Sequence, residues 1–280
     1  MSKVIQRAPK AYKNADFLNS PDARAIRIIS EFLEPLRRFR YQGVRDTIVF
    51  FGSARTKPMR EVAAARRAIE RRVRNSKKGA TSLRQKLRKA EIAEKMSAYY
   101  EDAVELSRRL TRWSKHLYQE NRFVVCSGGG PGIMEAANRG ASLAGGKSIG
   151  LNISLPFEQS PNRYISKEFN FEFHYFFMRK FWFVYLAKAF VMFPGGYGTL
   201  DEMMEVLTLL QTNKIKKKVT LVLYGREYWE KVLSFEEMVN HGVIHRRDLR
   251  LFTFADSPKE AYDHLVRELT KNYPRETAAG

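Results

Sequence analysis

Seven short apolar runs alternate along this chain with longer stretches that mix apolar and polar residues at helical spacing. Short apolar runs bounded by turn residues are typical of buried strands, and a 3.6-residue period is typical of amphipathic helices. Strands that alternate with helices form a parallel sheet with helices on both faces. The pattern predicts an α/β fold with a Rossmann-like, doubly wound parallel sheet, whose strands we expect at residues 47–51, 122–126, 147–153, 169–175, 189–193, 218–224 and 251–255.

Helices are expected before the sheet begins and between its strands. Ser20-Pro21-Asp22 has the sequence of an N-cap followed by a first-turn proline, which predicts a helix that runs to Arg38. We expect this helix to form an N-terminal helical extension over residues 1–45, ahead of a domain that spans 46–280. Further helices are expected at 178–187, 203–210 and 227–240, and from Ser257-Pro258 to the end of the fold.

Residues 59–74 and 82–120 have the pattern of two helices separated by a polar break at 75–81, which predicts a basic helical hairpin inserted over about residues 57–118. Much of the net charge of +20 lies here, because residues 55–115 hold 19 basic and 7 acidic residues. The basic runs alternate with apolar residues as they do on a solvated helix face. We favour that interpretation, and contact with RNA or an acidic partner is the alternative.

The composition is that of a globular intracellular protein. A chain of 280 residues is long enough for one large α/β domain with its own core. Cys126 is the only cysteine, which excludes an internal disulfide framework and a cysteine-based zinc site. No apolar stretch reaches the length of a membrane span, and the N-terminus lacks the apolar core of a signal peptide. We expect a cytoplasmic protein with no membrane partner.

Three loops rich in small residues follow predicted strands, at Gly52-Ser53, 128–132 and 194–198. In parallel sheets ligands bind beyond the carboxyl ends of the strands, so these loops are expected to share one site. The Gly-Gly-Gly-Pro-Gly spacing differs from the dinucleotide fingerprint, and the Lys-Ser/Thr of a Walker A loop is missing, which disfavours NAD enzymes and ATPases. The scattered histidines indicate neither a metal site nor a Ser-His-Asp arrangement. We expect no cofactor.

The sequence Pro-Gly-Gly-Tyr-Gly-Thr-Leu-Asp-Glu at 194–202 joins a predicted strand to a predicted helix. Glycines let the backbone approach a ligand closely, and the N-terminus of a helix attracts anions, so this turn suits a phosphate. Thr199 is expected to cap the helix and to donate a hydrogen bond to the phosphate, with Asp201 and Glu202 in the first helical turn. The alternative is that both acids merely favour the helix dipole.

Met178-Arg179-Lys180 follows the aromatic cluster Tyr175-Phe176-Phe177 at the start of the helix before this strand. Arg179 is expected to pair with Glu202 or with the phosphate. The aromatic side chains are expected to belong mostly to the core, with stacking on a base as the alternative.

Taken together, these residues resemble the Lonely guy (LOG) family, whose motifs are a glycine-rich G-G-G-x-x-G-x-M segment and P-G-G-x-G-T-x-x-E. Residues 128–134 match the first with the last glycine one position early, and residues 194–202 match the second in full. The family's Arg-Lys pair is matched by Arg179-Lys180 and its Gly-Ser turn by Gly52-Ser53. The resemblance covers roughly residues 46–56 and 120–270, so the N-terminal helix and the hairpin are additions.

The resemblance implies a phosphoribohydrolase that hydrolyses the N-glycosidic bond of a purine nucleoside 5'-monophosphate, either AMP (an AMP nucleosidase type of activity) or an N6-modified, cytokinin-type AMP. It also implies a homodimer or larger homo-oligomer. The older family label of lysine decarboxylase fits poorly, because nothing identifies a pyridoxal-binding lysine. A non-catalytic nucleotide or molybdenum-cofactor carrier is the alternative.

A carboxylate beside the anomeric carbon stabilises an oxocarbenium-like transition state and activates water, which makes Glu202 the candidate catalytic group. Arg179 is expected to orient that carboxylate or the ribose. The substrate-binding residues implied by the resemblance are Gly52, Ser53, Gly129, Gly130, Gly132, Met134, Glu135, Met178, Lys180, Gly195, Gly196, Gly198, Thr199 and Asp201.

Overall fold

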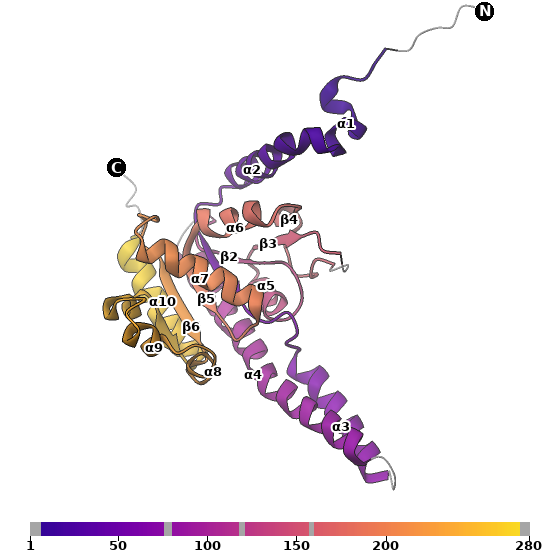
Figure 1. The fold of residues 1–280 in the computed structure, drawn as a ribbon, viewed down its shortest axis with the longest axis vertical. Coiled ribbons are helices and arrows are strands. Elements are labelled where there is room, and N and C mark those ends of the chain that lie inside the picture. The colour runs from indigo at the N-terminus through magenta and orange to yellow at the C-terminus, as the bar shows by residue number, and fades with distance from the viewer. Residues whose placement is uncertain (1–6, 76–79, 118–120, 157–159, 275–280) are drawn as a thin grey trace, which may run out of the picture.

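The computed structural model describes residues 7–75, 80–117, 121–156 and 160–274, and within these ranges it contains one sheet of seven parallel strands. The spatial order of the strands is β4-β3-β2-β1-β5-β6-β7 (Figure 1). Every pair of neighbouring strands is parallel, so all carboxyl ends lie at one edge. The strands are β1 (Thr47–Phe51), β2 (Val124–Ser127), β3 (Ser148–Ile153), β4 (Asn170–Phe173), β5 (Ala187–Met192), β6 (Thr220–Tyr224) and β7 (Thr253–Ala255).

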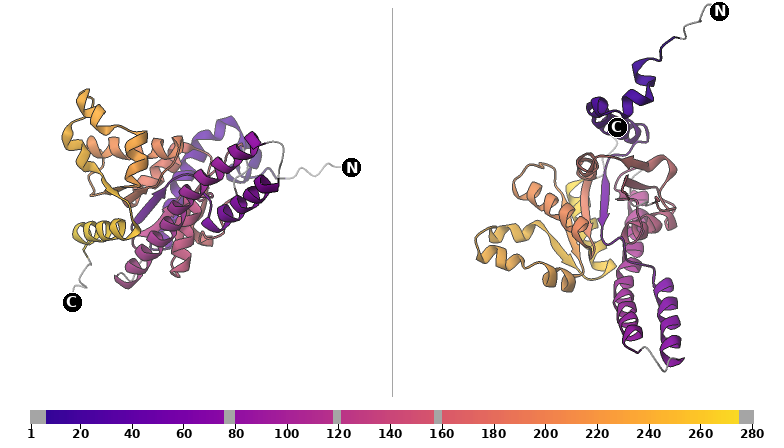
Figure 2. Two further views of the ribbon diagram at one scale, coloured as in Figure 1. Left: turned by 90° about the horizontal axis from the view of Figure 1, so that it is seen from below. Right: turned by 45° about the vertical axis from the view of Figure 1, so that its right-hand side comes forward.

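Helices cover both faces of the sheet, as Figures 1 and 2 show. Alternate residues of β1 point to opposite faces, so Val49 and Phe51 join one apolar core while Ile48 and Phe50 join the other. The first core also receives side chains from α2 (Arg24–Tyr41), α6 (Phe176–Tyr185), α7 (Tyr197–Gln211) and α8 (Arg226–Val232), and the second from α4 (Ala80–Leu117), α5 (Ile133–Leu143) and α10 (Pro258–Asn272).

The predicted α/β class and the doubly wound parallel sheet are confirmed, because each predicted strand overlaps an observed one. Apart from the helix over residues 59–75 described below, the remaining elements are short. They are α1 (Ala15–Asn19), α9 (Phe235–Asn240), and the 3-10 turns η1 (Ala11–Lys13), η2 (Pro21–Ala23), η3 (Lys167–Phe169) and η4 (Arg246–Leu251).

Two helix predictions were wrong in detail. The Ser20 side chain does not cap a helix, because its Oγ donates to Phe17 O at 2.7 Å and the following turn is the 3-10 turn η2, after which α2 begins. The single helix predicted over 227–240 is interrupted, and Ser234 Oγ accepts from Glu237 N to start α9 as a separate helix.

The predicted helical hairpin is formed by α3 (Met59–Asn75) and α4, and it projects from the body of the protein (Figure 2). Part of the predicted break, residues 76–79, and the predicted last turn of the second helix, residues 118–120, lie outside the described residues. The second half of α4 belongs to the core, because Tyr100, Leu106 and Leu110 are fully buried there. The predicted domain boundaries at residues 45, 57 and 118 stay predictions.

Although α4 has 38 residues, neither it nor any other helix within the described ranges is long and apolar enough to cross a membrane.

The chain order of the strands reverses between β1 and β5, which are neighbours in the middle of the sheet. The connections that follow these two strands therefore leave toward opposite sides and open a crevice between them. Crevices at such switch points are where parallel α/β folds bind their ligands. The loops that begin at Gly52 and Pro194 leave from this point.

Candidate active site

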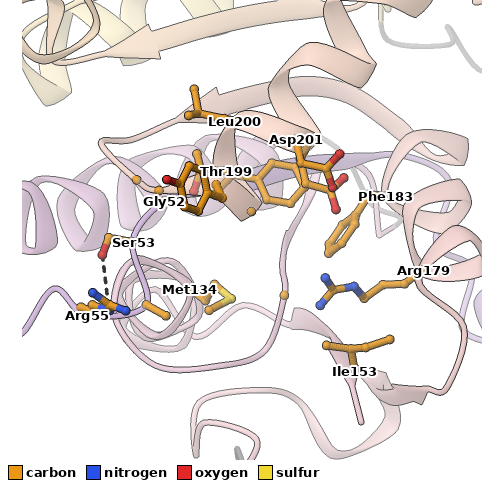
Figure 3. Close-up of a pocket in the computed structure, with 18 of the residues that line it drawn as sticks. Gly52, Ser53, Arg55, Met134, Ile153, Arg179, Phe183, Thr199, Leu200 and Asp201 are labelled. Carbon is orange, nitrogen blue, oxygen red and sulfur yellow. Dashed lines mark hydrogen bonds between the residues drawn. The ribbon is translucent and has the colours of Figure 1, made fainter. Parts of the chain in front are cut away.

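A cavity of about 660 Å³ lies at the carboxyl ends of the central strands (Figure 3). This volume is in the range of small-molecule sites. Its wall combines the Gly52-Ser53 turn, the loop and first turns of α7, one face of α6, and side chains from β3 and α4.

The loop at 194–196 presents bare backbone to the cavity because it is packed tightly from behind. Ser53 N donates to Pro194 O at 3.0 Å, and a Cβ on Gly195 would lie only 2.1 Å from Thr199 Oγ1. Gly196 is the N-cap of α7, and no side chain caps this helix end. The first N–H groups of α7 therefore lack helical acceptors beside the cavity, which makes this helix end suitable for an anion.

The second glycine loop, 128–132, packs against the first. Gly132 has φ +72°, and a Cβ there would lie 2.2 Å from Ser53 O, so only glycine fits. The first N–H of α5, that of Ile133, is already used because it donates to Ser53 O at 3.1 Å. The loop is also fixed from behind, since Asn162 Nδ2 donates to Gly129 O and Gly130 O. Of the two helix starts, that of α7 is the one open to a ligand.

Glu202 is the buried acid of the site, with an exposed fraction of 5%. Burial raises the pKa of its carboxyl to about 7, although Lys180 and Arg179 act in the opposite direction. Within the described residues no donor lies within hydrogen-bond distance of this carboxyl. A general base or a charge-stabilising group is expected to be a buried carboxyl that titrates near neutral pH and has no hydrogen-bond partner.

Arg179 extends from α6 into the cavity between Phe183 and Ile153 (Figure 3). Its guanidinium lies over the rings of Phe176 and Phe183, at 5.1 and 5.5 Å from their centroids. Its Nε is buried without a hydrogen-bond partner, and burial lowers the pKa of the guanidinium. The cation is thus held in place by stacking while its donors stay available to a ligand.

The start of α6 is fixed by the N-terminal helix. The Glu31 carboxylate of α2 accepts from the backbone N–H groups of His174 and Tyr175 at 2.7 and 3.2 Å. The Trp182 indole donates to Glu31 O at 3.0 Å. Since α6 carries Arg179, the extension helps to position this side chain.

Lys180 neutralises the exposed acid of the pair at 201–202. Its Nζ lies 2.7 Å from Asp201 and 2.9 Å from Glu205. Asp201 is thereby turned toward Lys180 while Glu202 stays inside. The two neighbouring acids are therefore in different environments, which allows them different functions.

The structure brings most of the predicted site residues to the cavity wall, and its local geometry corrects two expectations. Thr199 does not cap α7, because the helix begins at Tyr197, and the two acids fall in its second turn. No ion pair joins Arg179 to Glu202 within the described part of the chain, and the other alternative, pairing of Arg179 with the phosphate, stays a prediction. The predicted residues on the wall are Gly52, Ser53, Met134, Arg179, Gly195, Gly196, Gly198, Thr199, Asp201 and Glu202.

Six predicted residues do not reach the wall. Gly129, Gly130 and Gly132 shape the packed loop behind it, and Lys180 pairs with the acids of α7. Met178 is buried in the core, and Glu135 accepts a hydrogen bond from Tyr100 Oη at 2.8 Å. Their direct binding of substrate stays a prediction.

Among the residues of the wall that sequence reasoning missed are Met96, Asn152 and Tyr228. The sequence did contain an indication for Asn152, because a buried side-chain amide inside the apolar run of β3 needs hydrogen-bond partners. In the structure its Nδ2 donates to Asn170 Oδ1 and Phe171 O. The other two had none, since α4 and α8 reach the site only through the tertiary fold.

We expect Tyr228→Phe to raise the KM for a phosphate-bearing ligand about fivefold with little change in kcat, because it removes one hydrogen bond worth about 1 kcal/mol. Tyr228 Oη donates to Gly195 O at 2.6 Å and so holds the α7 loop. Steady-state kinetics check this. Tyr262→Phe on α10 is the matched control and should leave KM unchanged; equal effects of the two substitutions would contradict the assignment.

Comparison with known proteins finds similarity to relatives that carry the same description. A family model described as possible lysine decarboxylase matches residues 134–265. Cytokinin riboside 5'-monophosphate phosphoribohydrolase LOG7 of Arabidopsis thaliana is 38% identical over 89 residues, which are 31% of this chain and 39% of that protein. LOG3 of the same plant, described by the same words, is 29% identical over 183 residues, or 64% of this chain and 78% of that protein.

A probable enzyme of the same description, LOGL2 of Oryza sativa subsp. japonica, is 29% identical over 174 residues, 61% of this chain and 67% of that protein. The alignment with LOG7 spans less than half of that relative's length. Among solved structures, the Moco carrier protein from Chlamydomonas reinhardtii aligns with a TM-score of 0.45 at 16% identity, covering 81% of this chain and 99% of that one. The predicted resemblance to the LOG family is confirmed.

Proposed function

We propose that this chain, which is similar to the LOG family, is a phosphoribohydrolase that cleaves the N-glycosidic bond of purine nucleoside 5'-monophosphates. The observation that carries the proposal is the combination, in one cavity, of an uncapped helix start at α7 with the buried carboxyl of Glu202. The helix start suits a phosphate, and the carboxyl of Glu202 suits the cation that a sugar becomes during cleavage. A nucleotide contains a phosphate and a sugar at a fixed separation.

In the proposed reaction the 5'-phosphate binds to the backbone N–H groups at 196–199 and thereby places the ribose beside Glu202. The bond between C1' and the purine nitrogen breaks with its electron pair staying on the base. The ionised Glu202 stabilises the positive charge that develops on the sugar and accepts a proton from the attacking water. That proton leaves with the base, so the products are free purine and ribose 5-phosphate.

Arg179 is proposed to orient the ribose or the attacking water through its unpaired donors. The apolar part of the wall is proposed to hold the base, since its side chains offer flat or flexible surfaces to a purine. AMP and N6-modified, cytokinin-type AMP both suit such a wall. Its members are Met96, Ile153, Leu155, Phe176 and Phe183.

We also propose a homodimer or larger homo-oligomer. Large apolar side chains remain exposed on α2 and on the neighbouring α6, among them Ile29, Leu33, Phe177 and Tyr185. Contiguous exposed apolar surface is typical of protein–protein contacts. Sedimentation equilibrium tests this proposal, and a single species of monomer mass at micromolar concentration would contradict it.

The direct test of the activity is incubation of purified protein with a panel of nucleotides, followed by chromatography of released base. Release of adenine from AMP, or of the modified base from N6-isopentenyl-AMP, supports the proposal, with adenosine as the control that lacks phosphate. Absence of release from every purine monophosphate, together with tight nucleotide binding, would instead support a non-catalytic carrier.

We expect Arg179→Lys to lower kcat/KM roughly 100-fold, because lysine keeps the charge but loses the planar donors and their stacking on two rings. Thermal unfolding should change little, since no ion pair of Arg179 within the described chain is broken. Arg226→Lys on the exposed start of α8 is the control. An Arg179→Lys enzyme with full activity would remove this residue from the proposed chemistry.

A further inference from the structure

The projecting hairpin is an arm whose two helices are joined by an ion pair. We define the arm as residues 59–75 and 80–95, that is α3 and the first part of α4 (Figures 1 and 2). Arg66 ties its helices together, because it pairs with Glu70 at 2.9 Å on α3 and also with Glu94 on α4. Val62 on α3 and Ala90 on α4 are buried. These pairs use two of the arm's four acids internally.

The outer surface of the arm is left strongly basic. None of its exposed arginines and lysines lies within 4.0 Å of a carboxylate of the described chain. Helices of the body differ, since Arg226 pairs with Glu230, Lys231 with Glu227 and Lys259 with Asp263. Among the arm residues whose side chains the structure describes, the exposed cations are Arg60, Arg67, Arg71, Arg72, Arg84, Lys86, Arg88, Lys89 and Lys95.

The spacing of these cations is unfavourable for the helices themselves. Arg67 and Arg71 on α3, and Arg84 and Arg88 on α4, are like charges four residues apart. Each such pair costs an isolated helix roughly 0.2–0.5 kcal/mol, whereas a glutamate in one of the two places would stabilise it. A surface that serves only solubility does not require like charges four residues apart, which destabilise the helix. The pattern is instead the one expected of a surface that neutralises a polyanion.

We propose that the arm is a docking surface for double-stranded RNA, bound through its phosphates without sequence specificity. Within its described residues Ile92 is the exposed large apolar side chain, and no aromatic side chain is exposed. Single strands are usually bound by stacking on aromatic rings, and membranes by apolar side chains, so both fit the arm less well than a duplex backbone.

The choice of RNA over DNA rests on the proposed function. Met96, which directly follows the arm on α4, lines the cavity proposed to take ribonucleoside 5'-monophosphates. Hydrolysis of RNA is a reaction class that releases such monophosphates. An arm bound to RNA keeps the cavity near that source.

The test measures RNA binding alone, by fluorescence anisotropy with a labelled RNA duplex of about 16 base pairs. We expect affinity to fall steeply between about 50 and 200 mM salt. Replacing Arg67, Arg71, Arg84 and Arg88 by glutamine should weaken binding at least tenfold and reduce the slope of log affinity against log salt by about 3–4. The matched control removes the same charge from the body by changing Arg226, Lys231, Arg246 and Lys259 to glutamine, with less than a twofold effect.

A second variant with lysine at the four arginine positions keeps the charge and should retain binding, which separates lost charge from lost folding. Circular dichroism checks helix content in both variants. The proposal is overturned if the duplex does not bind at low salt, if both glutamine variants weaken binding equally, or if duplex DNA, single-stranded RNA or anionic vesicles bind more tightly. Because no turnover is measured, failure of the hydrolase assay leaves this result intact.

Discussion

Glu202→Gln is expected to lower kcat roughly 1,000-fold while the Kd for AMP stays within about threefold. Glutamine keeps the shape of the side chain but can neither accept the proton of water nor stabilise a sugar cation with a full charge. Rapid-quench kinetics and calorimetric titration of AMP measure the two quantities separately. Loss of nucleotide binding together with turnover would show instead that Glu202 holds the site together.

Glu205→Gln is the matched control, because this acid lies on the same helix and faces Lys180 rather than the cavity. We expect its kcat to stay within about threefold of the unchanged protein. Comparable losses in the two variants would indicate a general effect of charge on α7.

Glu202→Gln is also expected to stabilise the folded protein above neutral pH. The folded state raises the pKa of Glu202 from an ordinary 4.5 to about 7. The unfolded chain therefore loses this proton first, so stability falls as pH rises from about 4.5 to about 7 and then levels off. A shift of this size corresponds to ~3 kcal/mol, and glutamine removes it.

Urea unfolding at pH 5 and pH 8 checks the expectation. Glu202→Gln should gain up to ~3 kcal/mol at pH 8 over the unchanged protein and little at the lower pH. An equal difference at both pH values would point to packing rather than titration. The acid limb of the kcat/KM profile near pH 7 should also be missing from the residual activity of this variant.

Gly195→Ala is expected to lower kcat/KM for AMP by roughly 100-fold and to destabilise the fold by about 1–3 kcal/mol. A Cβ at this position would lie 2.1 Å from Thr199 Oγ1 and 2.7 Å from Thr199 Cβ, and 3.1 Å from Ser53 N. The loop must then shift away from the β1 turn, which moves the backbone proposed to hold the phosphate. Kinetics with AMP and thermal unfolding measure both effects.

Gly198→Ala is the control for stability. Nothing lies within 4 Å of a Cβ at Gly198, and this position is in α7, where alanine is favoured over glycine by about 1 kcal/mol. Its melting temperature should be unchanged or higher. If Gly195→Ala also leaves the melting temperature unchanged or raises it, then tight packing around Gly195 does not determine the conformation of the loop.

The parts of this protein that the sequence predicts well are those governed by local pattern. The buried strands appear as apolar runs because both faces of a covered parallel sheet are dry, and β1 is such a run. Glu202 and Arg179 were predicted from the motifs and lie on one cavity. The site as a set of binding residues stays a prediction.

Neither the exact starts of helices nor the contacts between distant segments were predictable from the sequence. Ser20 has a capping sequence, yet its hydroxyl donates to a preceding carbonyl instead. Thr199 is a residue type that often caps helices, yet the N-cap of α7 is Gly196, so the helix starts three residues earlier than a Thr199 cap would allow. Tyr228 and Asn162 fix the two glycine loops through hydrogen bonds that span more than 30 residues of sequence, for which no local signal exists.

The bonds from Glu31 to the start of α6 link the N-terminal helix to the helix that carries Arg179. The amide protons of His174 and Tyr175 are covered by a carboxylate that precedes them by more than 140 residues. We therefore expect the exchange of these two amides with deuterated solvent to report opening of the contact between α2 and α6. The predicted boundary at residue 45 separates α2 from the sheet in the sequence, while these two bonds join α2 to α6 in space.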